Sequence, residues 1–221
     1  SEAAPGYILS STNGTFAAVT MNAAIDSLAI DAGLGDDAVS TAGLDSFTPA
    51  LVLTGGEGVD NLDLGSGHYA TLTLGTGSSE EGSAGNDAVT GDFTVGSFTF
   101  NARPSIANRV HVFQDYSGKI TIVDETDVGT TITSISAPTE SFTINTGYNA
   151  PGTTEYIHVG QDPTGAVRPW QAPLNADLII NAGKLSKNLD GDDSVIIYSN
   201  LTLTGHRLDI TANNISINSG V

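Results

Sequence analysis

Four short motifs place a glycine, an aspartate and an aliphatic residue at one fixed spacing, Gly-x-Asp-x-(Val/Leu). They are Gly35/Asp37/Val39, Gly58/Asp60/Leu62, Gly85/Asp87/Val89 and Gly191/Asp193/Val195. The glycine permits a turn with positive φ, and the carboxylate supplies the hard oxygen ligands that calcium prefers. Three of the four motifs follow an alternating apolar segment. The pattern therefore indicates one type of turn, used repeatedly, that can bind calcium.

Further carboxylates surround these turns. Calcium takes six to eight oxygen ligands, so one turn is a weak site unless turns on consecutive repeats align into a ladder. The predicted metal ligands are Asp36, Asp37, Glu57, Asp60, Asp63, Asp87, Asp190, Asp192 and Asp193. The alternative is that these residues bind no metal and instead cap turns by accepting hydrogen bonds from local backbone amides.

The most complete motif occupies residues 55–63, Gly-Gly-Glu-Gly-Val-Asp-Asn-Leu-Asp, and fits the nonapeptide Gly-Gly-x-Gly-x-Asp-aliphatic at every position. Here the chain resembles the RTX calcium-binding repeat of secreted bacterial toxins, proteases and surface-layer proteins. Residues 32–40, 82–90 and 188–196 are partial copies. The resemblance implies calcium held between adjacent turns by the Asp carboxylate and nearby carbonyls. The copies depart from the family because their Asp residues lie 23, 27 and 106 residues apart instead of in tandem.

Short apolar-x-apolar segments predict the strands that position these turns. They begin at Leu28, Leu51, Leu72, Phe98, Ile120, Phe142, Leu178 and Leu201, at spacings of 23, 21, 26, 22, 22, 36 and 23 residues. A period near 22 is typical of a solenoid, in which stacked coils share a core that no coil can form alone. We therefore expect a single all-β domain over residues 1–221, folded as a parallel β-solenoid (β-helix).

Two segments depart from this period. Residues 160–176 are rich in proline and contain the only Trp. We expect a protruding loop there, either a plain surface loop or one in which Trp170 and Arg168 contact a glycan or a protein partner. Residues 109–123 are compatible with an antiparallel hairpin around Tyr116 to Lys119, but their place in the 22-residue count favours a coil.

Composition restricts the partners and the compartment. Acidic residues outnumber basic ones 25 to 7, and the formal net charge of −18 disfavours nucleic acid and anionic lipid surfaces. The chain has no cysteine and no apolar run near the roughly 20 residues of a membrane helix. The first residue is not Met, so we expect a processed chain or a fragment. These features favour an extracellular protein of a bacterial cell surface.

The sequence favours a non-enzymatic structural protein, stabilised by calcium, that assembles into a surface layer, filament or adhesin stalk. Its expected partners are other copies, or neighbouring coils of a longer parent chain, and cell-surface glycans. Residues 201–215 also resemble the stalk repeats of filamentous-haemagglutinin-type adhesins. One alternative is an enzyme on the same architecture: a polysaccharide lyase, although the seven basic residues form no constellation for it, or a glycosidase, whose acid pair could lie anywhere among the 25 carboxylates. Another alternative is a carbohydrate-binding module.

Overall fold

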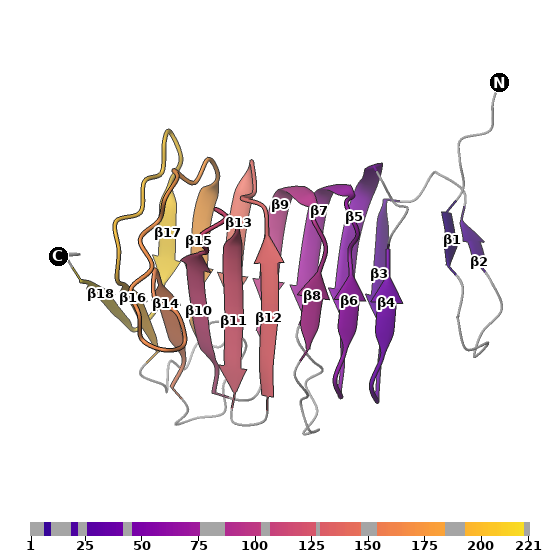
Figure 1. The fold of residues 1–221 in the computed structure, drawn as a ribbon, viewed down its shortest axis with the longest axis horizontal. Coiled ribbons are helices and arrows are strands. Elements are labelled where there is room, and N and C mark those ends of the chain that lie inside the picture. The colour runs from indigo at the N-terminus through magenta and orange to yellow at the C-terminus, as the bar shows by residue number, and fades with distance from the viewer. Residues whose placement is uncertain are drawn as a thin grey trace.

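The computed structural model describes residues 7–9, 19–21, 26–41, 46–75, 87–102, 107–126, 129–146, 154–183 and 193–218. All regular secondary structure within these ranges is β-strand (Figure 1). The all-β prediction is therefore confirmed, as expected for a chain whose apolar residues alternate with Thr, Ser and Asn. The described part of the chain contains no helix that could span a membrane.

Seven strands form a wholly parallel sheet. In chain order they are β3 (Ser27–Asp31), β5 (Ser46–Thr54), β7 (His68–Gly75), β9 (Thr94–Asn101), β13 (Ser141–Asn145), β15 (Asp177–Asn181) and β17 (Leu208–Thr211). Their register places Leu28, Leu51, Leu72, Phe98, Phe142, Leu178 and Leu208 in one column across the sheet. Because the side-chain period of a strand is two, the whole column faces the core.

Nine strands form the second sheet. They are β4 (Ala38–Ser40), β6 (Asn61–Asp63), β8 (Ala88–Thr90), β10 (Arg109–Gln114), β11 (Ile120–Thr126), β12 (Gly129–Ile135), β14 (Tyr156–Val159), β16 (Ser194–Ile197) and β18 (Asn214–Ile217). From β3 onward the chain alternates between the two sheets, except that β10, β11 and β12 follow one another in the nine-stranded sheet. The strands β1 (Tyr7–Leu9) and β2 (Val19–Met21) pair with each other as a separate antiparallel sheet.

The prediction of a coil at Ile120 is wrong. Strands β10, β11 and β12 are antiparallel neighbours, and the spatial order is β14-β10-β11-β12-β8. Apolar alternation reports burial of one face, and a hairpin strand has the same alternation as a strand of a parallel repeat. The expected strand at Leu201 is also wrong: Leu203 makes only an isolated bridge to Leu174, and the next strand of the parallel sheet begins at Leu208.

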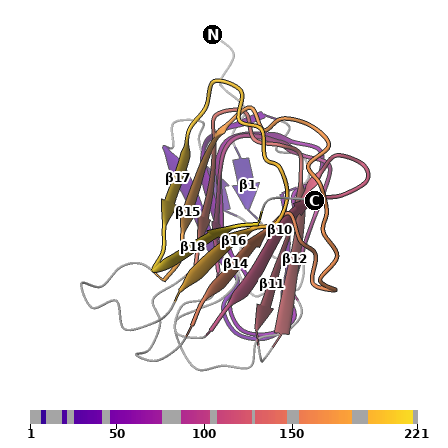
Figure 2. The same ribbon diagram turned by 90° about the vertical axis from the view of Figure 1, so that its left-hand side faces the viewer.

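The core lies between the two sheets, which face each other when the molecule is viewed from its C-terminal end (Figure 2). Leu51, Leu72, Phe98 and Phe142 from the parallel sheet are fully buried in it. Each such side chain stabilises the fold by about 1.5–3 kcal/mol. At the ends of three parallel strands, the amides of Asn101, Asn145 and Asn181 bond in a row at 2.8 Å.

Candidate functional site

The predicted metal ligands of the first three turns come together, but the carboxylates of four of the six accept hydrogen bonds from backbone amides. The Oδ1 atom of Asp60 accepts the N–H of Asp37 at 2.9 Å, and the Oδ1 atom of Asp87 accepts the N–H of Asp60 at 3.0 Å. Near the other end, the Oδ1 atom of Asp193 accepts the N–H of Glu155 at 3.0 Å. Each carboxylate thus joins one repeat to the preceding one. We call these three bonds the carboxylate–amide ladder.

Close backbone stacking explains why glycines precede these Asp residues. Gly56 and Gly58 have φ values of 101° and 124°. A β-carbon on Gly56 would lie 2.0 Å from the carbonyl oxygen of Gly33, and one on Gly58 would lie 2.3 Å from that of Gly35. The stacked turns also exchange backbone bonds, from Glu57 N–H to Gly33 at 2.8 Å and from Gly35 N–H to Glu57 at 2.7 Å.

Other predicted ligands are also used in hydrogen bonds to backbone amides. The Oδ1 atoms of Asp36 and Asp63 accept the amides of Val59 and Gly65 at 2.9 and 3.0 Å. Carbonyl oxygens of the stacked turns accept hydrogen bonds from neighbouring amides. Within the described ranges, no group of three or more His, Asp or Glu is placed to hold a metal. Asp190 and Asp192 lie outside the described residues, and calcium binding stays a prediction.

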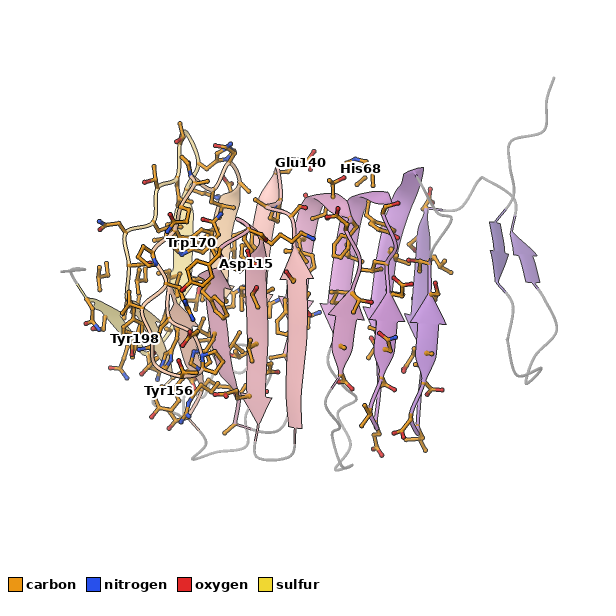
Figure 3. All side chains as sticks on the ribbon, in the orientation of Figure 1. His68, Asp115, Glu140, Tyr156, Trp170 and Tyr198 are labelled. Carbon is orange, nitrogen blue, oxygen red and sulfur yellow. The ribbon has the colours of Figure 1, made fainter. Side chains whose placement is uncertain are left out.

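Arg168 and Trp170, the predicted partner contacts, have structural roles in this fold. The Nε and Nη2 atoms of Arg168 both lie 2.7 Å from Oδ2 of Asp162. The guanidinium also stacks on Tyr116, 5.0 Å from the ring centroid, and donates a hydrogen bond to its hydroxyl. Trp170 is half-buried and packs against the core (Figure 3). Contact of either side chain with a partner stays a prediction.

A repeat that the sequence analysis missed lies near these residues. Residues 111–118 and 158–165 share the pattern His-Val-x-Gln-Asp-x-(Ser/Thr)-Gly, 47 residues apart. Strands β10 and β14 contain the first halves of the two copies and pair in parallel register. Comparison of the chain with itself at an offset of 47 reveals the repeat, whereas a search for apolar alternation at 22 does not.

The two copies end in the same turn. The Oδ1 atom of Asp115 accepts the Ser117 hydroxyl and amide at 2.6 and 2.8 Å and the amide of Lys119 at 3.0 Å. The Oδ1 atom of Asp162 accepts the equivalent groups of Thr164 and Ala166 at 2.6, 3.0 and 3.0 Å. These bonds lower the pKa of both carboxyl groups, against the effect of burial. Both turns therefore contain a charged Asp at neutral pH whose Oδ1 atom accepts three hydrogen bonds.

A hollow of about 260 Å³ lies on the outer face of β10, β14 and β16. Val110 and Val112 face the core, so the alternate residues Arg109 and His111 face outward into the hollow. The rest of its lining includes Tyr156, His158, Gln161 and Ile196, and it contains no carboxylate among the described residues. The paired acids of a glycosidase are thus absent from this lining.

Two histidines from the repeat form the wall of the hollow. His111 and His158 are register partners, and their rings meet edge to face with centroids 4.8 Å apart. His158 also contacts Tyr198, with ring centroids at 5.3 Å. Figure 3 shows Tyr156 and Tyr198 on the β14–β16 side of the molecule. Nδ1 of buried His111 lies 3.2 Å from the Gln161 carbonyl oxygen.

The histidines are neutral at neutral pH. Burial lowers the pKa of His158 to about 4, and the positive charges of Arg109 and of His111 in its protonated form act in the same direction. Burial also lowers the pKa of His111, although its bond to Gln161 and the carboxylate of Glu125, 3.3 Å from Nε2, act in the opposite direction. Arg109 is therefore the charged group of the hollow.

A second candidate surface is the end of both sheets at β17 and β18, which faces the viewer in Figure 2. Leu208, Ile215 and Ile217 are 41, 51 and 70% exposed. They occupy core columns, because their register partners on the preceding strands are Leu178, Val195 and Ile197, all buried. The apolar core is thus open at this end of the described structure.

Comparisons with known proteins identify no family for this chain. No protein-family model, no curated protein and no solved structure matches it. The resemblances to RTX repeats and to adhesin stalks therefore stay predictions from the motifs alone.

Proposed function

We propose that this chain is a β-solenoid in a non-enzymatic extracellular structural protein, and that copies stack end to end into a filament, stalk or surface layer. The open core columns at Leu208, Ile215 and Ile217 carry the proposal, because they continue buried columns without a covering strand among the described residues. Such an end is completed by one more parallel repeat.

The opposite end offers matching strands. Leu28 and Ile30 of β3 and Val39 of β4 are only partly buried, and they occupy the same core columns as the residues of the open end. All strands of the seven-stranded sheet run in one direction. A second copy can therefore extend β17 and β18 with its own β3 and β4 in head-to-tail orientation, which leads to an open filament rather than a closed dimer.

The energetics favour a weak end-to-end contact between copies that depends on protein concentration and salt. Covering three exposed aliphatic side chains contributes about 1.5–3 kcal/mol each, and new backbone bonds along two strand edges add to this. Association costs about 4–15 kcal/mol, and copies with a net charge of −18 repel one another at low salt. We expect assembly to increase with protein concentration and ionic strength. The proposal does not depend on calcium.

Electron microscopy and light scattering of the 221-residue chain test the proposal, with and without a chelator. The variant Ile215→Lys/Ile217→Lys places two charges in the open core and should remain monomeric. Val59→Lys is the matched control, since Val59 is 52% exposed in a turn away from this end. Wild type and control should form rods or sheets whose length rises with salt. Short monodisperse monomers of the wild-type chain under all conditions would contradict the proposal.

A further inference from the structure

The hollow on β10, β14 and β16 contains a cation that the fold does not use in an ion pair. Lys119, Arg168 and Arg207 lie 2.9, 2.7 and 3.0 Å from carboxylates of Asp92, Asp162 and Asp177. Arg109 is the only Lys or Arg in the described ranges without a carboxylate at such a distance, although acidic residues outnumber basic ones 25 to 7. A guanidinium binds a carboxylate through two parallel hydrogen bonds.

The carboxylate opposite Arg109 in the sheet forms no ion pair with it. Glu125 lies opposite Arg109 in the β10–β11 register, but its Oε2 atom lies 3.3 Å from Nε2 of His111. Arg109 instead lies over the ring of Tyr156, 5.9 Å from its centroid. The charge is thus held at the rim of the hollow and remains accessible, since Arg109 is exposed.

Aromatic groups line the same hollow. Tyr156 is 36% exposed and packs edge to face against His158, with ring centroids 6.2 Å apart. Aromatic faces next to polar groups suit a sugar ring, which has apolar C–H faces and hydroxyls at its edge. The Gln161 side chain also lines the hollow; its Nε2 donates to the Gly165 carbonyl oxygen at 3.1 Å, and its amide oxygen can accept a hydrogen bond from such a hydroxyl.

The size of the hollow restricts the ligand. Its volume of about 260 Å³ is below the roughly 300–1,000 Å³ of ordinary small-molecule sites, so it accommodates one ring. It is open to solvent, so the ring can belong to a longer chain that continues outside the hollow. We propose that the hollow binds one uronic-acid residue of an acidic polysaccharide, with Arg109 pairing with its carboxylate and Tyr156 and His158 contacting its ring.

Calorimetric titration with tri-galacturonic acid tests this assignment, at 0.15 M salt and pH 7.5 with a chelator present. The fully methyl-esterified trisaccharide removes only the charge, and benzoate supplies a carboxylate without a sugar. We expect the free acid to bind at least about tenfold more tightly than either, which corresponds to one lost charge-assisted contact. Arg109→Gln and Tyr156→Ala should each weaken binding by about tenfold or more. Arg207→Gln is the matched control and should bind as the wild type does.

Every titration is repeated on the Ile215→Lys/Ile217→Lys background, so that the outcome is independent of end-to-end assembly. Circular dichroism of each variant confirms that it folds. Equal affinity for the acid and its ester, unchanged binding by Arg109→Gln, or no saturable binding would overturn the proposal. Benzoate that binds as tightly as the trisaccharide would overturn the assignment of a sugar.

Discussion

Mild acid should destabilise this fold through His158. Burial and the nearby charges of His111 and Arg109 lower its pKa from 6.5 to about 4. The unfolded chain therefore takes up a proton near pH 6.5, while the folded chain does so only near pH 4. Because the unfolded state binds more protons in this window, the free energy of unfolding falls as the pH decreases.

The expected loss follows from the size of the shift. Each pKa unit corresponds to about 1.36 kcal/mol, so lowering the pH from 7.5 to 4 should cost about 3 kcal/mol through His158. The groups around the imidazole are His111 and Arg109 of β10, Tyr156 of its own strand and Tyr198 after β16. The pKa of His111 is lowered as well, so His111 adds a loss of the same sign.

Urea denaturation followed by the fluorescence of Trp170, at several pH values from 7.5 to 4.5, measures this effect. His158→Gln should flatten the pH dependence by up to about 1.4 kcal/mol per pH unit between pH 6 and 5. The exposed His68→Gln is the control and should keep the wild-type slope. Three carboxyl groups have lowered pKa values, those of Asp115, Asp162 and Asp177. Their contribution to the free energy of unfolding is lost below about pH 4, outside this window. Parallel profiles for wild type and His158→Gln would refute the reasoning.

Three further predictions concern the stacked turns. Asp60→Ala removes the acceptor of the Asp37 amide and should lower the free energy of unfolding by about 1–3 kcal/mol, whereas Asp60→Asn keeps an acceptor oxygen and should lose much less; equal losses in urea titrations would contradict the carboxylate–amide ladder. Gly56→Ala places a methyl group against the Gly33 carbonyl and should cost more than about 2 kcal/mol, while Gly165→Ala, with a φ of 85° but open space around it, should cost about 1–2 kcal/mol in the same assay. Chelation should leave the thermal midpoint unchanged, because backbone bonds hold the described turns; a fall of several degrees would instead support the calcium prediction.

Much of the strand layout is predictable from sequence, since a strand buried on one face has an apolar residue at every second position. Leu28, Leu51 and Leu72 are spaced by nearly one repeat and do occupy one column. The alternation does not depend on strand direction. The 22-residue period therefore predicts a coil at Ile120, whereas the structure has a hairpin there. The same limit applies to Asp60, because a turn motif indicates a hydrogen-bond acceptor without identifying the amide 23 residues away that uses it.

The candidate site lies next to an irregular repeat of the second sheet, the one that contains the inserted strands β11 and β12. Strands β11 and β12 separate β10 from β8, and β10 then pairs with β14, which brings His111 next to His158. The inserted β11 supplies Glu125, whose Oε2 atom lies 3.3 Å from Nε2 of His111 and which forms no ion pair with Arg109. The β10–β11 turn supplies Tyr116, which contacts Arg168 and so links this turn to the turn after β14. The insertion thus supplies Glu125 and Tyr116 as neighbours of the candidate site, whereas the hollow itself is lined by residues of β10, β14, β16 and the turn after β14.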